Sequence, residues 1–273
     1  EAKTIGEKSL ALSEGISDST NIALSFKNLG EIYSMENNLD SAAASYLKAI
    51  RILEHLKKEN SKLGDCYVGI GEIYMNLNNF EKSQDFLDKG ISLFSSIDDY
   101  DGVMFASSML GALNFNHKKY ETAIELLSPA LEYYQSVGDP YRISESNRYL
   151  GLSYLKTGNF LDAETKLGDA VSYGREAGEP INLAAALMGY GNLLLNNKKF
   201  DAALELFEEA DNLYSDVDHM MGKIESTQML SLLFEQTGDF KKSNYYLKAL
   251  GHLKDSLNTA NNATVVQDLE AKY

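Results

Sequence analysis

The histidines, the single cysteine and the paired acids are the residues of this 273-residue chain that could do chemistry. Histidine and cysteine side chains ligate metals, and two neighbouring carboxylates can act as a general acid and a general base. The four histidines, His55, His117, His219 and His252, stand far apart, and none has a partner at metal-ligand spacing. We therefore expect no metal site.

The acidic and glycine-rich segments also favour structural roles. Asp98-Asp99 and the acids at 216 and 218 are typical of helix caps. The segment Gly69-Ile70-Gly71 lies inside an apolar helical stretch, and it lacks the preceding strand and the third glycine of a dinucleotide-binding loop. We expect no catalytic residue and no cofactor in this region.

The charge of the chain excludes some classes of partner. Forty acidic residues against 25 basic ones give a net charge of −15, which repels phosphate groups. We expect no nucleic-acid partner and no direct contact with a membrane, since no apolar run approaches the roughly 20 residues of a membrane span. The lone Cys66, in an apolar stretch typical of a buried thiol, suits a reducing or an oxidising compartment alike.

An internal repeat predicts the helices that must position any binding residue. Its first landmark is a glycine at spacings of 41, 40, 40 and 40: Gly30, Gly71, Gly111, Gly151 and Gly191, with Ser231 in the sixth place. Its second landmark is a large residue after a polar turn: Leu39, Phe80, Tyr120, Phe160, Phe200 and Phe240. Apolar residues before and after each turn follow a 3.6-residue period, which predicts two helices in each unit. The small residues allow these two helices to pack closely and antiparallel.

The motif Leu-Gly-x-x-Tyr, followed by alanine, a large apolar residue and alanine, resembles the tetratricopeptide repeat family. Its best copies are Leu150-Gly151…Tyr154…Ala163…Leu167…Ala170 and Leu29-Gly30…Tyr33…Ala42…Tyr46…Ala49. The resemblance implies an all-α fold, a right-handed superhelical solenoid of antiparallel helix pairs. The units are about 40 residues long, against about 34 in the commonest form of the family.

The repeat also predicts how the chain is organised. We expect a single solenoid over residues 1–257, with a partial repeat at 1–18 followed by six units of about 40 residues. Residues 258–273 are expected to form a connecting segment, the start of a linker helix. Pro129 falls inside the second helix of the third unit, where we expect it to kink that helix.

The resemblance implies a function as well. Tetratricopeptide repeats hold a protein or peptide in a concave groove lined by their first helices. Carried over position by position, this implies contacts at Phe105, Ala112, Phe115, Arg148, Leu152, Leu155, Met188, Asn192 and Leu195. The flanking units place acids such as Glu31 and Glu235 at these positions, which suits an amphipathic helix or an apolar peptide with basic flanks. Burial between long helices explains the same apolar residues equally well, and this alternative stays open.

The last segment resembles the exit of repeat arrays in bacterial sensor proteins. It reads Leu-Lys-Asp-Ser-Leu at 253–257 and Leu-Glu-Ala-Lys-Tyr at 269–273. The resemblance implies the sensory or interaction region of a two-component kinase or a transcriptional regulator, with an output module such as a kinase domain beyond Tyr273. It also implies an extracytoplasmic location and leaves a homodimer through the C-terminal segment open. A cytoplasmic location and a free-standing scaffold or chaperone adaptor are the alternatives.

Overall fold

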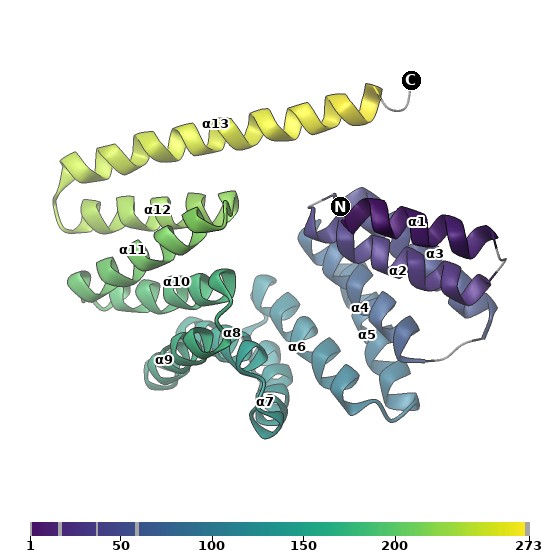
Figure 1. Cartoon of the computed structure of the whole chain (residues 1–273). Coiled ribbons are helices and arrows are strands. Elements are labelled where there is room, and N and C mark those ends of the chain that lie inside the picture. Colours follow the sequence, from purple (N-terminus) through teal and green to yellow (C-terminus); the bar gives the residue numbers. More distant parts are fainter. Residues whose placement is uncertain (1, 16–17, 37, 58–59, 271–273) are drawn as a thin grey trace. The chain divides into compact units, whose positions relative to one another are not determined.

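A computed structural model describes residues 2–15, 18–36, 38–57 and 60–270 (Figure 1). All regular secondary structure in these residues is helical, and turns of two to five residues join consecutive helices into antiparallel hairpins. The helices are α1 (Ala2–Gly15), α2 (Ser19–Met35), α3 (Leu39–His55), α4 (Ser61–Asn76), α5 (Phe80–Ser96), α6 (Tyr100–Asn116), α7 (Tyr120–Val137), α8 (Pro140–Thr157), α9 (Phe160–Ala177), α10 (Pro180–Asn196), α11 (Phe200–Asp216), α12 (Met220–Gln236) and α13 (Phe240–Glu270). The predicted all-α fold of helix pairs is confirmed.

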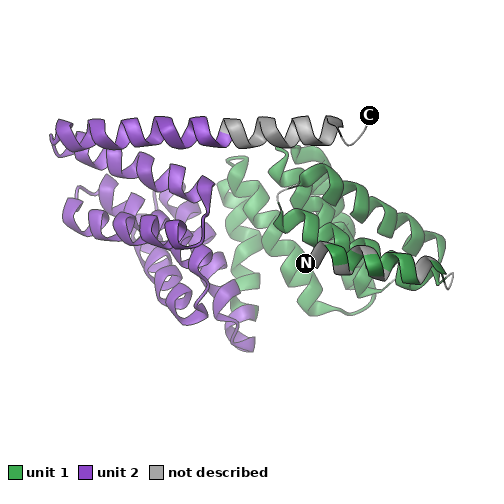
Figure 2. Ribbon diagram, turned by 45° about the horizontal axis from the view of Figure 1, so that its top comes forward, with its two compact units in different colours: residues 1–133 green, residues 134–273 purple. Residues whose placement is uncertain are grey.

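The helices form two compact units, residues 1–133 (unit 1) and 134–273 (unit 2), shown in different colours in Figure 2. Unit 2 contains the hairpins α8/α9, α10/α11 and α12/α13. The division falls inside α7 and not at a linker, and α7 is helical on both sides of Pro129. The single solenoid over 1–257, the linker helix at 258–273 and a kink at Pro129 stay predictions.

In the five hairpins from α2/α3 to α10/α11, a glycine in the first helix faces a large residue in the second helix. A Cβ atom at Gly151 would lie 2.6 Å from Leu167 Cγ, and one at Gly191 would lie 2.6 Å from Phe207 Cε1. Leu167 and Phe207 are both 0% exposed. Because real Cβ atoms do not approach other atoms so closely, the helix spacing requires glycine at these positions.

The apolar sides of successive hairpins stack into a shared core. In unit 2, one cluster of buried side chains extends from Leu167 of α9 through Leu187 and Phe207 to Phe234 of α12. Full burial of a side chain of this size contributes about 1.5–3 kcal/mol. Each hairpin therefore depends on its neighbours for stability, as in other repeat proteins.

The turns repeat at half the interval of the sequence motif. A residue with φ between 52° and 85° ends a helix at every twentieth position: Asn78, Asp98, Lys118, Gly138, Gly158, Gly178, Lys198, Asp218 and Gly238. Four of them are glycine, which adopts this left-handed conformation freely, whereas a lysine there is strained by its Cβ atom.

Lys198→Gly is expected to raise the free energy of unfolding by about 1 kcal/mol, because glycine removes the Cβ strain at φ 58°. Urea unfolding followed by circular dichroism measures the change. Asn197→Gly is the matched control, since exposed Asn197 has φ −84° and gains no such relief. Equal effects of the two substitutions would show that the left-handed turn carries no strain.

One of the helix N-caps predicted from the sequence is confirmed, and another is wrong. Asp99 caps α6, where its Oδ1 atom accepts a hydrogen bond from the Gly102 amide at 3.0 Å. The cap predicted at Asp218 is wrong, since that residue takes the left-handed turn position. His219 caps α12 instead, and its Nδ1 atom accepts from the Gly222 amide at 3.0 Å.

Candidate peptide-binding face

The predicted contact residues lie in both units, and in unit 1 they all belong to α6. Ala112 is buried, whereas Phe105 and Phe115 are half-buried. Phe105 packs against the buried cluster that contains Leu113, and the Phe115 ring lies 5.7 Å from the Tyr120 ring, centroid to centroid. Both phenylalanines therefore contribute to the core of unit 1 and keep part of their surface exposed.

The other six predicted residues lie on α8 and α10 of unit 2, and these two helices pack against each other. Met188 and Leu195 of α10 are only 4% and 1% exposed, so they belong to the core. Leu152 and Leu155 of α8 are half-buried and pack on the same cluster. Burial therefore accounts for Met188 and Leu195, whereas the two α8 leucines offer accessible apolar surface.

The side chain of Arg148 lies against α10 at a glycine. A Cβ atom at Gly189 would lie 3.7 Å from both Arg148 Cγ and Leu152 Cδ2, an ordinary van der Waals distance, so α10 packs directly beside the stem of the arginine. The guanidinium carbon lies 4.0 Å from the centroid of the Tyr149 ring, in a cation–π contact. The Arg148 Nε atom is buried and has no hydrogen-bond partner among the described residues. Arg148 makes no ion pair within the described part of the chain, but its guanidinium is hydrogen-bonded to Tyr149 and interacts electrostatically with Glu145.

Two further polar residues lie near Arg148. Asn192 of α10 is half-buried, one turn after Gly189, and its Oδ1 atom is 3.5 Å from Asn196 Nδ2. Glu145 lies one turn before Arg148, and burial raises the pKa of its carboxyl above the usual range, although the Arg148 guanidinium opposes this shift. Burial thus disfavours the negative charge of Glu145, while Arg148 always keeps its positive charge.

Glu145→Gln is expected to be more stable than the wild type at neutral pH. A carboxyl whose pKa is raised in the folded state destabilises the fold as the pH rises through that pKa, and glutamine cannot ionise. The free energies of unfolding should converge as the pH falls towards about 4, where glutamate becomes protonated in both states. Urea unfolding across this range measures the difference, and a variant less stable at neutral pH would show that the ionised carboxylate stabilises the fold.

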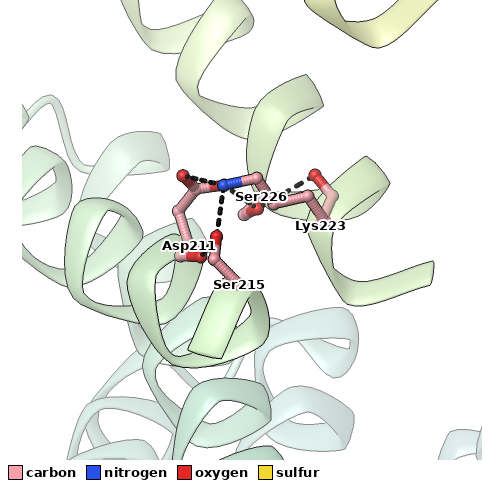
Figure 3. Close-up of polar contacts among 4 residues, drawn as sticks. All are labelled: Asp211, Ser215, Lys223 and Ser226. Carbon is pink, nitrogen blue, oxygen red and sulfur yellow. Dashed lines mark hydrogen bonds and ion pairs between the residues drawn. The ribbon is translucent and has the colours of Figure 1, made fainter. Parts of the chain in front are cut away.

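Lys223 of α12, another cation of unit 2, differs from Arg148 because its partners lie within the chain. Its Nζ atom lies 2.7 Å from Asp211 Oδ2 and donates to Ser215 Oγ, as Figure 3 shows. Ser226 Oγ donates to Asp211 Oδ1 at 2.6 Å. These contacts join α11 to α12 and satisfy the lysine, so this cluster has no need of a ligand.

Asn147 is a notable polar residue that the sequence analysis missed. It is 0% exposed, and neither atom of its side-chain amide has a hydrogen-bond partner among the described residues. Tyr67 and Leu187 hold the same place in two other first helices, but Ser107 and Thr227 hold it in two more. The sequence therefore contains no clear signal for Asn147. A buried amide of this kind is a place for a bound water or a polar ligand group.

The histidines and the cysteine hold surface, helix-end or buried positions in the structure. His55 and His252 are exposed, His117 follows the end of α6, and His219 caps α12. Burial raises the pKa of the Cys66 thiol to about 12, so it stays protonated and unreactive near neutral pH. Within the described ranges, no group of three or more His, Cys, Asp or Glu residues is arranged to hold a metal. No described helix combines the length and the apolar character that crossing a membrane requires.

A family model described as "Tetratricopeptide repeat" matches residues 150–216, which cover the last eight residues of α8 and all of α9 to α11. The chain belongs to the tetratricopeptide-repeat family. A second model, described as "Uncharacterized protein conserved in bacteria (DUF2225)", matches residues 8–148, or 141 of the 273 residues, and the chain belongs to this family as well. No curated protein matches the sequence.

Solved structures resemble this tetratricopeptide-repeat chain at low sequence identity. BtubC from P. vanneervenii is 16% identical, with a TM-score of 0.64 over 80% of this chain and 91% of its own. A Rap protein complexed with Competence and Sporulation Factor is 13% identical, with a TM-score of 0.68 over 88% and 76%. The Rap conjugation gene regulator of the plasmid pLS20, in complex with the Phr* peptide, is 17% identical, with a TM-score of 0.69 over 92% and 78%. These similarities show the fold, and they confirm the predicted solenoid of helix pairs.

Proposed function

We propose that the chain is a protein-interaction module that binds a peptide on the α8–α10 face, the surface formed by Arg148, Leu152, Leu155 and Asn192. The observation that carries the proposal is the state of Arg148, a half-buried guanidinium that makes no ion pair with a carboxylate among the described residues. The acid that acts on it, Glu145, is itself disfavoured as an anion by burial, so the positive charge is poorly compensated, which is unfavourable. A ligand carboxylate would supply the charge and the paired hydrogen bonds that a guanidinium accommodates.

The neighbouring residues define the rest of the ligand. Leu152 and Leu155 offer apolar surface, and Asn192 offers an amide to the peptide backbone. The ligand is therefore a peptide with one carboxylate and adjacent apolar side chains. Basic residues flanking the apolar part of the ligand, which the acids on other first helices favour, are a separate prediction.

The comparisons support a peptide ligand. Two of the similar structures are Rap proteins in complexes, one with Competence and Sporulation Factor and the other with the Phr* peptide. One of them is named a conjugation gene regulator. On this basis we propose that the module serves in signal transduction, as the interaction region of a kinase or a transcriptional regulator. Phe105 and Phe115 of unit 1 are proposed as further contacts.

Selection of random peptides displayed on phage against the purified chain tests the proposal. We expect enrichment of peptides that combine apolar residues with an acidic residue or a free C-terminal carboxylate. Arg148→Gln is expected to weaken their binding about tenfold or more, since a charge-assisted hydrogen bond contributes about 1.5–3 kcal/mol. Lys156→Gln, an exposed lysine on the same helix, is the control and should leave affinity unchanged.

Two results would contradict this function. The first is a selection that enriches no peptide above the level seen with an unrelated helical protein. The second is binding that Arg148→Gln does not change while the circular dichroism spectrum confirms an intact fold. A scaffold without peptide specificity would then be the better description.

A further inference from the structure

The second helix of the last hairpin, α13, exposes a residue that is covered in every earlier hairpin. The covered equivalents are at most 5% exposed: Tyr46, Leu87, Leu127, Leu167 and Phe207. Leu247 holds the same place in α13 and is 52% exposed. Leu247 therefore differs from an ordinary surface leucine, because it occupies a position that is used for packing in the five earlier hairpins.

The covered residues lie between two first helices, their own and that of the next hairpin. For Tyr46, a Cβ atom at Gly30 of α2 would lie 3.0 Å from the ring, and one at Gly69 of α4 would lie 2.5 Å from Cζ. Leu247 has α12 on one side, and the described part of unit 2 places no further first helix on the other. The helix itself is 31 residues long, against 17 or 18 in the second helices of the earlier hairpins.

The charge of α13 is opposite to that of the chain. Between residues 240 and 257 it carries four lysines and one aspartate, a sum of +3, whereas the chain as a whole carries −15. The preceding second helix, α11, carries six acids and no lysine or arginine, a sum of −6. Lys248 and Lys254 are both exposed.

Lys254 shows what kind of helix fits this position. It stands on the same side of α13 as Leu247, two turns further on, where other second helices place the buried residues Phe94 and Tyr214. An apolar first helix of the usual kind would bury the charge of Lys254 without a partner, which is unfavourable. A helix with an acidic residue at this point would instead pair with it.

We propose that the surface of α13 around Leu247 and Lys254 binds an amphipathic helix with acidic flanks from a partner protein. The apolar side of the partner helix covers Leu247, in the way that the first helix of a following hairpin would. The acidic residues of the partner helix lie beside Lys248 and Lys254. A second copy of the chain fits less well, because pairing two α13 helices would bring their lysines together. This surface is independent of the α8–α10 face.

Two synthetic peptides of about 18 residues test the proposal with the 273-residue chain, since this length forms about five helical turns. Both carry leucines at helical spacing; one has glutamates beside the stripe and the other has lysines at the same places. Fluorescence anisotropy should show that the glutamate peptide binds at least about tenfold more tightly. Leu247→Ser should remove most of this binding, and Lys254→Glu should shift the preference towards the lysine peptide. Lys118→Glu, in a turn of unit 1, is the charge control and should change neither.

The proposal would be overturned if the two peptides bind with equal affinity, or if neither binds. Analytical ultracentrifugation of the chain alone measures its oligomeric state and provides a second test. A concentration-dependent dimer that Leu247→Ser abolishes would assign the surface to a second copy and would also overturn it. Because Arg148→Gln should not affect the glutamate peptide, failure here and failure of the α8–α10 face can be told apart.

Discussion

Gly151→Leu is expected to lower the free energy of unfolding by about 3 kcal/mol, near the upper end of the usual range for an overpacked core. A Cβ atom at this position would lie 2.6 Å from Leu167 Cγ and 3.0 Å from the Leu167 backbone nitrogen. Side-chain rotation can relieve the first contact, but only separation of α8 from α9 relieves the second. Urea unfolding of the purified variant measures the loss.

Gly168→Ala is the matched control, because this glycine lies inside α9 with nothing within 4 Å of its Cβ position. Alanine there should stabilise the chain by about 1 kcal/mol through its helix propensity. Opposite signs for the two glycines would establish that Gly151 is required for packing. An unchanged unfolding curve for Gly151→Leu would refute the packing argument.

Gly222→Leu is expected to lower the free energy of unfolding by about 2–3 kcal/mol at the joint between α11 and α12. A Cβ atom at Gly222 would lie 2.4 Å from Tyr214 Cδ1, and Tyr214 is 3% exposed. The same arrangement recurs in unit 1, where a Cβ atom at Gly102 would lie 2.3 Å from Phe94 Cδ1. A large residue in the second helix thus faces a glycine in the next first helix.

Tyr214→Ala should partly restore the Gly222→Leu variant, because it opens the volume that leucine needs. The double-mutant cycle is expected to show a favourable coupling of about 1–3 kcal/mol, typical of residues in contact. Additive losses would mean that the two side chains do not share one packing site.

The fold could be predicted because its packing requires specific residue types at a fixed interval. Glycine weakens a helix interior by roughly 1 kcal/mol, so glycines such as Gly151 and Gly191 in register reveal a steric demand. The turns were harder to predict from the sequence, since Lys118 and Lys198 take the left-handed positions that glycine holds elsewhere. Lysine carries no turn signal of its own, and the 20-residue interval therefore appears only in the backbone.

The candidate site was harder to predict because helical periodicity does not distinguish an open side from a covered one. Leu152 and Leu195 hold inward positions in neighbouring first helices, yet the first is half-buried and the second is 1% exposed. Arg148 was predicted as a contact residue, but its packing against α10 beside Gly189 depends on how α10 crosses α8. Sequence spacing within one helix holds no information about that crossing.

The most direct test of a carboxylate bound by Arg148 is a double-mutant cycle measured by titration calorimetry. It compares the wild type and Arg148→Gln, each with a selected peptide and with the same peptide lacking its charge. Amidation removes a terminal carboxylate and Asp→Asn or Glu→Gln removes a side-chain one, so the two sources are distinguished. The account predicts a coupling of about 1.5 kcal/mol or more for one of these changes. No coupling for any of them, with tight binding to the wild type, would contradict it.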